Sequence, residues 1–243
     1  MKALFTDIRQ GRVDDVRRRL DTDPSLVAAV AKAPPKKDDG QSPLQVAIKA
    51  GCLEIAELLI DRGANVNYIE ATSVNDWRAP VIHDALRATV MRSRWLAPAS
   101  RADDTSSWVV ANSTESADGW YALLVRIIGA GADVHSLDSY GNSCLHRVIL
   151  DARQLLPRVH FDDPTWVDPK PLNDELVHDL TRVFRLLYEN GVDPDRELDR
   201  HSGSPLSIAY RQDSVGPFLD SASLSAPVRP TQKKRSWRSF LGR

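Results

Sequence analysis

Residues 40–67 read GQSPLQVAIKAGCLEIAELLIDRGANVN and contain two short helical patterns separated by a glycine. Ser42 and Pro43 form a typical helix start, because a serine hydroxyl caps free backbone N–H groups and proline suits the first helical position. Gly51 is placed to end this first helix and Gly63 to end a second one, since glycine readily adopts the left-handed backbone conformation. The stretch therefore predicts a helix–turn–helix unit followed by an extended segment.

The same pattern recurs farther along the chain. GADVH at residues 131–135 and GVDP at 191–194 match the end of the unit, whereas GNSCLH at 141–146 and GSPLSIA at 203–209 match its start. Residues 80–86 read PVIHDAL and give a weaker version of the first helix. The chain therefore consists of repeated units of one kind.

The stretch 40–67 resembles the ankyrin repeat, whose pattern G-x-T-P-L-H-x-A is followed by a second helix and G-A-D-V-N. Ankyrin repeats have about 33 residues, and at least three must stack to form a continuous core. The resemblance implies an all-α fold, an ankyrin-repeat solenoid of about five helix-turn-helix repeats with short finger turns. The implied units over residues 1–220 are a capping repeat at 1–36 and repeats near 37–69, 73–135, 136–195 and 198–220.

Two of these repeats carry insertions between their helices, at 93–118 and 155–173. The second segment contains four prolines, which exclude a regular helix there. Because equivalent loops lie side by side in a stack, we expect the two insertions to form one wall. Its aromatic residues either pin the loops onto the helices or form a partner surface; the candidates are Trp95, Trp108 and Trp166.

The resemblance also implies a binding groove, formed by the finger tips and the exposed face of the first helices. Trp77 and Tyr140 occupy equivalent places in adjacent fingers, so we expect them to be near neighbours. Exposed tryptophan and tyrosine are enriched at binding hot spots, although such a tyrosine can equally pack on the next finger. The candidate partner-binding residues in the groove are Asp39, Gln41, Lys49, Trp77, Arg87, Tyr140 and Asn142.

The sequence contains none of the common phosphate-binding, metalloprotease or nucleophile-elbow motifs. Cys144 and His146 lie close together, but both fall in a helix-opening motif where a structural role is expected. His83 takes the same position in its own repeat. We therefore predict a protein that is not an enzyme and that has no catalytic residues, no metal site and no cofactor.

Charge divides the 243-residue chain into two parts. Residues 221–243 carry six basic residues and no acidic one, and since the whole chain has a net charge of −1, residues 1–220 carry −7. The acidic body makes a nucleic-acid partner improbable and would steer a basic protein. The basic tail is interpreted as flexible, with docking onto the stack or contact with an anionic membrane as alternatives.

No signal-peptide pattern or membrane-length apolar stretch is present, so we expect a cytoplasmic protein. The function that follows is a non-enzymatic protein–protein interaction module that acts as adaptor, regulator or inhibitor. One alternative is an immunity-type protein that neutralises a cognate toxin, by resemblance of architecture. Another is a small-ligand binder or an enzyme that uses the insertion wall.

Overall fold

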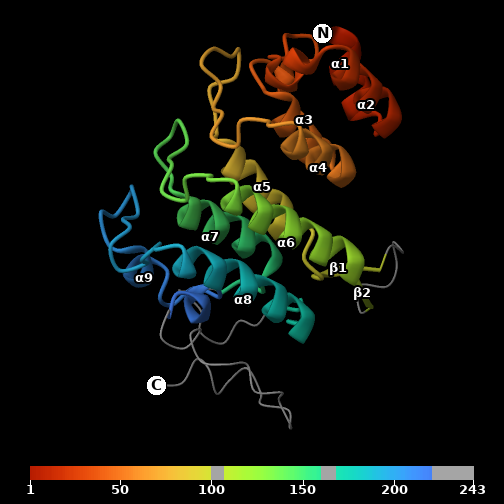
Figure 1. Cartoon of the computed structure of the whole chain (residues 1–243). Coiled ribbons are helices and arrows are strands. Elements are labelled where there is room, and N and C mark those ends of the chain that lie inside the picture. The colour runs from red at the N-terminus through yellow and green to blue at the C-terminus, as the bar shows by residue number, and fades with distance from the viewer. Residues whose placement is uncertain (100–106, 160–167, 221–243) are drawn as a thin grey trace.

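The computed structural model describes residues 1–99, 107–159 and 168–220. Within these ranges the longer helices follow one another in pairs, and Figure 1 shows the pairs stacked in chain order from the N-terminus. The paired helices are α1 (Lys2–Arg9) with α2 (Val13–Thr22), α3 (Pro43–Ala50) with α4 (Leu53–Asp61), α5 (Val81–Met91) with α6 (Thr114–Gly129), and α7 (Cys144–Leu155) with α8 (Asp174–Glu189).

The helices form two layers. In one layer α1 contacts α3, α3 contacts α5 and α5 contacts α7, and in the other α2, α4, α6 and α8 contact one another in the same order. The apolar core lies between the layers, with fully buried side chains such as Leu44, Ile55, Leu86, Leu124 and Phe184. Each pair thus buries its apolar stripe against its neighbours, as stacked repeats require.

The shorter elements lie in the connections and at the C-terminal end. They are the 3₁₀ turns η1 (Pro24–Ala28), η2 (Lys36–Asp38) and η3 (Gly216–Phe218), the short helix α9 (Leu206–Ala209), and the strands β1 (Leu96–Pro98) and β2 (Trp108–Val110). η3 packs against α8 and brings Phe218 onto Phe184, with ring centroids 5.4 Å apart. This contact closes the C-terminal end of the described stack.

Serine caps explain where the helices begin. The Ser42 hydroxyl accepts a hydrogen bond from the N–H of Gln45 (3.2 Å), and the Gln45 side chain accepts one in return from the N–H of Ser42 (3.1 Å). Ser113 and Ser143 cap α6 and α7 in the same way, without the reciprocal bond. These contacts satisfy donors that a helix start otherwise leaves free.

The structure corrects the predicted fold class in one segment. The insertion expected at 93–118 contains a small antiparallel hairpin, in which Leu96 faces Val110 and Pro98 faces Trp108. The fold is therefore mostly helical rather than purely α. α6 also begins at Thr114, inside the expected insertion, because the Ser113 cap starts the helix earlier.

Three long connections project from the same side of the stack in Figure 1, and we call them the finger loops. They are residues 62–80, 130–143 and 190–205. The β1–β2 hairpin lies at the opposite end of the paired helices. No helix in the described ranges is long and apolar enough to cross a bilayer. The predicted basic tail at 221–243 lies outside the described residues.

Gly51 offers a direct test of the turn between α3 and α4. Its φ of +77° lies in the left-handed region, where a residue with a Cβ is strained, and an added Cβ would also displace the flexible end of the Arg92 side chain. We expect Gly51→Ala to lower the free energy of unfolding by about 1–2 kcal/mol. Gly129→Ala is the control, because that helical glycine has open space around it and should tolerate alanine. Urea denaturation of both variants tests this, and equal stabilities would contradict it.

Candidate functional site

Buried acidic residues fix the shape of the finger loops. The Asp138 carboxylate accepts hydrogen bonds from the backbone N–H groups of Tyr140 and Asn142 and from Nε1 of Trp77, each at 2.9 Å. Asp199 does the same in the third finger loop, and Glu70 accepts from the N–H of Ala79 at 3.2 Å in the first. Burial raises the pKa of Asp138, but the hydrogen bonds from Trp77 and Asn142 outweigh it, so the pKa is lowered and the carboxylate stays ionised.

A large aliphatic side chain precedes each of these acidic residues and points to solvent. Ile69, Leu137 and Leu198 are 41%, 54% and 57% exposed. Tyr140, in the second finger loop, is 50% exposed. One large exposed aliphatic side chain therefore recurs in each of the three finger loops. We call Ile69, Leu137 and Leu198 the finger row.

Trp77 and Tyr140, expected to be near neighbours, are joined through Asp138. Trp77 donates to one carboxylate oxygen and the backbone of Tyr140 donates to the other. Trp77 is half-buried, with Nζ of Lys49 5.4 Å and Cζ of Arg147 5.6 Å from its ring centroid. Its indole therefore forms part of the groove wall rather than a free finger tip.

Two of the predicted groove residues have structural partners instead. Gln41 is only 4% exposed and donates from Nε2 to the carbonyl of Lys37 (3.2 Å), so its prediction as a surface contact was wrong. Asp39 is half-buried and accepts from the N–H groups of Ala33 (2.8 Å) and Val74 (2.9 Å). Those bonds lower the pKa of Asp39 and tie the turn after η2 to the first finger loop.

Asn142 also has a structural partner within the second finger loop. Its Nδ2 donates to the Asp138 carboxylate at 2.9 Å, alongside its own backbone N–H. Lys49 and Arg87 are different, because their side chains reach solvent over the groove. The predicted groove residues thus divide into those that build the fingers and those that face the groove.

Lys49, Trp77 and Arg87 line a cavity of 440 Å³, which we call the groove cavity. Its other lining residues come from α3, from α5 and the residue after it, and from the segment between β2 and α6; they are Ile48, Asp84, Ala88, Met91, Arg92 and Asn112. Arg87 forms an ion pair with the buried carboxylate of Asp151 on α7. The cavity therefore sits where neighbouring repeats meet.

Asp84 is the unusual group in this cavity. Its side chain is 1% exposed and neither carboxylate oxygen has a well-formed hydrogen bond among the described residues, although Lys49 and Gln45 lie near enough to favour its charged form. Nζ of Lys49 lies 3.4 Å from Oδ1 and provides an ion pair. Burial raises the pKa of Asp84 to about 7, against the opposing effect of Lys49. At neutral pH this group is poised between its neutral and charged forms.

A second cavity of 320 Å³ lies between the two insertions, and we call it the insertion cavity. Trp95 and Trp108 line it from the first insertion, and Arg158 and Lys170 from the second. Trp95 donates from Nε1 to the carbonyl of Met91 (3.4 Å), and Nζ of Lys170 lies 5.0 Å from its ring centroid. The predicted Trp166 lies outside the described residues.

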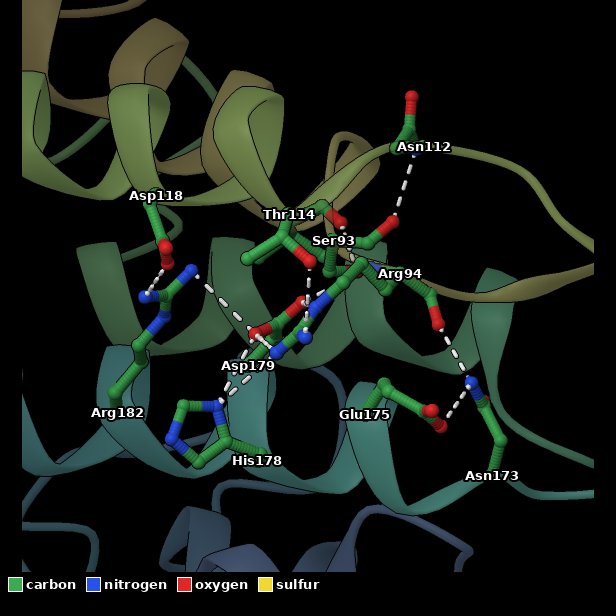
Figure 2. Close-up of polar contacts among 11 residues, drawn as sticks. Ser93, Arg94, Asn112, Thr114, Asp118, Asn173, Glu175, His178, Asp179 and Arg182 are labelled. Atoms are coloured by element: carbon green, nitrogen blue, oxygen red, sulfur yellow. Dashed lines mark hydrogen bonds and ion pairs between the residues drawn. The ribbon is translucent and has the colours of Figure 1, made fainter.

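An ion-pair network holds the first insertion against α8, close to where the second insertion ends (Figure 2). Asp179 accepts hydrogen bonds from the backbone N–H (2.9 Å), Nε (3.0 Å) and Nη2 (2.7 Å) of Arg94. Asn173 donates from Nδ2 to the carbonyl of Arg94 (2.8 Å). Arg182 extends the network to Asp118 on α6. These contacts fix the chain on both sides of the insertion cavity.

The cysteines and buried histidines have structural environments. Burial raises the pKa of Cys144 to about 12, so it is a neutral thiol at physiological pH. Nε2 of His83 is 3.0 Å from the carbonyl oxygen of Ser136, and Nε2 of His146 is 3.1 Å from the Tyr210 hydroxyl. Within the described residues no group of three potential metal ligands converges.

Residues 39–70 match the family model of the ankyrin repeat. The match begins directly after η2 and covers the capped helix α3, the turn at Gly51, helix α4 and the start of the first finger loop. It confirms the resemblance for this one repeat, and an ankyrin repeat indicates a role in protein binding in general. No curated protein matches the chain.

Sequence reasoning missed the finger row and Asp84. A signal for the finger row is present, because Leu137 and Leu198 each stand directly before the aspartate that shapes their loop. Asp84 gave no such signal. The burial of Asp84 beside Lys49 depends on which side chains α3 and the first finger loop bring near it. These contacts cannot be read from the sequence.

Proposed function

We propose that this chain is a non-enzymatic protein-binding module, built from a stack of about five ankyrin-type repeats, that holds a partner on its finger loops and groove. The helix pairs on either side of residues 39–70 are divergent copies of that repeat. They share its alternation of two helices and an extended loop. The surface they present continues across the stack.

The finger row carries this proposal. Ile69, Leu137 and Leu198 each directly precede the buried acidic residue of a finger loop and expose large aliphatic side chains. Exposure of this kind has no benefit for the isolated fold, since each side chain gains free energy when it is removed from water. Tyr140 beside them is of a residue type enriched in binding hot spots. A partner protein that covers the row would bury all four side chains.

The proposal predicts that binding is lost when the row is made polar. We expect the triple variant Ile69→Ser, Leu137→Ser and Leu198→Ser to capture its partner at least about tenfold more weakly than the wild type, since each large side chain contributes about 1–2 kcal/mol when buried. Affinity capture from lysate of the source cells, followed by binding measurements on the captured protein, provides the measurement. The variant should keep its helical circular dichroism, because the three positions face solvent.

The matched control replaces Val109, Val110 and Val125 by serine. These valines are 51%, 47% and 41% exposed and lie on β2 and α6, away from the fingers. We call the triple serine variant of Ile69, Leu137 and Leu198 the finger variant. Normal partner capture by the control and loss of partner capture in the finger variant would support the proposal. Normal capture by the finger variant would overturn it. Loss in the control alone would move the contact surface to the insertion side.

A further inference from the structure

We infer that the groove cavity binds an acidic side chain, glutamate or aspartate, which a partner protein inserts beside Trp77. This inference rests on the proposed function, because it names the chemistry of the segment that enters the groove. It concerns residues that the finger row does not include, so the two can be tested separately.

Cations form the solvent-facing part of the groove. Side chains of Lys49 and Arg87 are 29% and 43% exposed, whereas their partners Asp84 and Asp151 are 1% and 0% exposed. Each ion pair therefore presents its positive member to an incoming ligand and keeps its negative member beneath. The charge that a partner meets is positive, although residues 1–220 as a whole are acidic.

Arg153 and Asp213 repeat this arrangement farther along the stack. Nε of Arg153 lies 2.8 Å from Oδ2 of Asp213, and the two side chains are 42% and 10% exposed. The cationic face thus extends beyond the groove cavity. This cationic face favours an acidic partner segment, whereas the net charge of residues 1–220 favoured a basic partner. The net charge includes buried carboxylates that no ligand can reach.

Arg92 supplies a cation that is not already neutralised. Its guanidinium lies 4.7 Å from the ring centroid of Trp120, and no described carboxylate forms an ion pair with it. A guanidinium carries five N–H donors in a fork that matches a carboxylate. Arg92 lines the groove cavity together with Lys49 and Arg87, so three cations surround the space.

The hydrogen-bonding capacity of Asp84 is only partly used in the free protein. A buried polar group without a well-formed hydrogen bond costs free energy, and Asp84 has only Lys49 at 3.4 Å and the nearby Gln45 amide. When a ligand carboxylate enters, it shares Lys49 with Asp84, and Asp84 in its neutral form donates a hydrogen bond to it. Ile48, Met91 and the Trp77 ring line the cavity beside these groups and suit the methylene groups of the inserted side chain.

The test uses two blocked peptides of equal length, one rich in glutamate and one with lysine at the same places, both with a central leucine. Each is titrated into the full chain while the indole Nε1–H resonance of Trp77, assigned from Trp77→Phe, is followed by NMR. We expect the acidic peptide to shift this resonance in a saturable way and the basic peptide to leave it in place. No shift with millimolar acidic peptide, or an equal shift with the basic one, would overturn the inference.

Two variants with opposite expected effects separate binding chemistry from a change in folding. Arg92→Gln removes the unpaired cation and should weaken acidic-peptide binding at least about threefold. Asp84→Asn leaves Lys49 without its competing carboxylate and should strengthen binding by a similar factor. Arg196→Gln, which changes an 87% exposed arginine outside the groove, is the matched control and should bind as the wild type does. Equal affinities of Arg92→Gln and the control would overturn the inference.

The finger variant completes the design. With Ile69, Leu137 and Leu198 replaced by serine, the acidic peptide should still shift Trp77, because the cavity residues are intact. Failure of the peptide test with loss of partner capture in the finger variant would contradict the inference alone. Unchanged partner capture in the finger variant would contradict the proposed function alone.

Discussion

Asp179→Ala is expected to lower the free energy of unfolding by about 3–5 kcal/mol, because it leaves the mostly buried Arg94 without its carboxylate partner. The Asp179 side chain is 2% exposed, and those of Arg94 and Arg182 are 16% and 18% exposed. The substitution also removes the acceptor for the backbone N–H of Arg94. Urea denaturation followed by far-ultraviolet circular dichroism measures the change.

The effect should depend on pH in a definite direction. Burial alone would raise the pKa of Asp179, but the hydrogen bonds from Arg94 have the larger opposite effect. The net result is a lowered pKa in the folded state. A lowered pKa stabilises the fold above the unfolded-state value of about 3.9, and this contribution is lost as pH falls through the folded-state value. The wild type and Asp179→Ala should therefore differ most near neutral pH and converge in acid.

Asp61→Ala is the matched control, since Asp61 forms an exposed ion pair with Arg126 between α4 and α6. Exposed pairs contribute about 0–1 kcal/mol. If Asp179→Ala were no more destabilising than Asp61→Ala, the network of Figure 2 would not hold the insertions in place. The expected difference also links stability to the site, because Arg94 directly precedes Trp95 of the insertion cavity.

The helices were predictable from sequence because their signals are local. Ser42, Pro43 and Gly51 mark the ends of α3, and a capping serine recurs at Ser143 before α7. The small hairpin was not predictable, because three-residue strands have no periodicity to detect. Local signals thus gave the elements and their order.

Contacts between repeats account for most of what sequence reasoning missed at the site. Lys49 and Asp84 pair across α3 and α5, and Arg87 and Asp151 pair across α5 and α7. The first insertion lies between the members of the second pair, so no regular spacing relates them. Gln41 was misplaced for a similar reason, since its burial depends on how the turn at Lys37 folds back. Charge counted along the chain cannot show which member of each pair faces the ligand.

Asp84→Asn is expected to stabilise the protein near neutral pH, by up to about 4 kcal/mol relative to the wild type. Burial raises the pKa of Asp84 to about 7 in the folded protein, with Lys49 opposing the shift and Glu70 adding to it. An unfolded aspartate has a pKa of about 3.9. Asparagine has nearly the same shape and carries no charge, so it avoids the cost of burying an ionisable carboxyl group.

The sign follows from the order of the two pKa values. Below pH 4 Asp84 is neutral in both the folded and the unfolded state. Ionisation then costs the wild type no free energy of unfolding, and the variant is little more stable than the wild type. Between pH 4 and pH 7 the carboxyl ionises in the unfolded chain but not in the folded one, so the wild type is progressively destabilised. Above pH 7 both states are ionised and the difference between variant and wild type becomes constant.

Urea denaturation of both proteins from pH 4 to pH 8 measures this difference at each pH. Asp61→Asn provides the control, because it makes the same substitution at a carboxylate that is 59% exposed. A difference for Asp84→Asn that stays flat over this range, or that falls as pH rises, would contradict the prediction.

A stabilising replacement at Asp84 would also bear on function. Ionisable groups with strongly shifted pKa values cluster at sites of binding or chemistry. In the groove cavity the variant should be more stable and should bind the acidic peptide more tightly. It should also lose the dependence of that binding on pH, because no group with a pKa near 7 would remain beside Lys49. Stability and affinity that both follow the charge of Asp84 would identify this carboxyl as the group that tunes the groove.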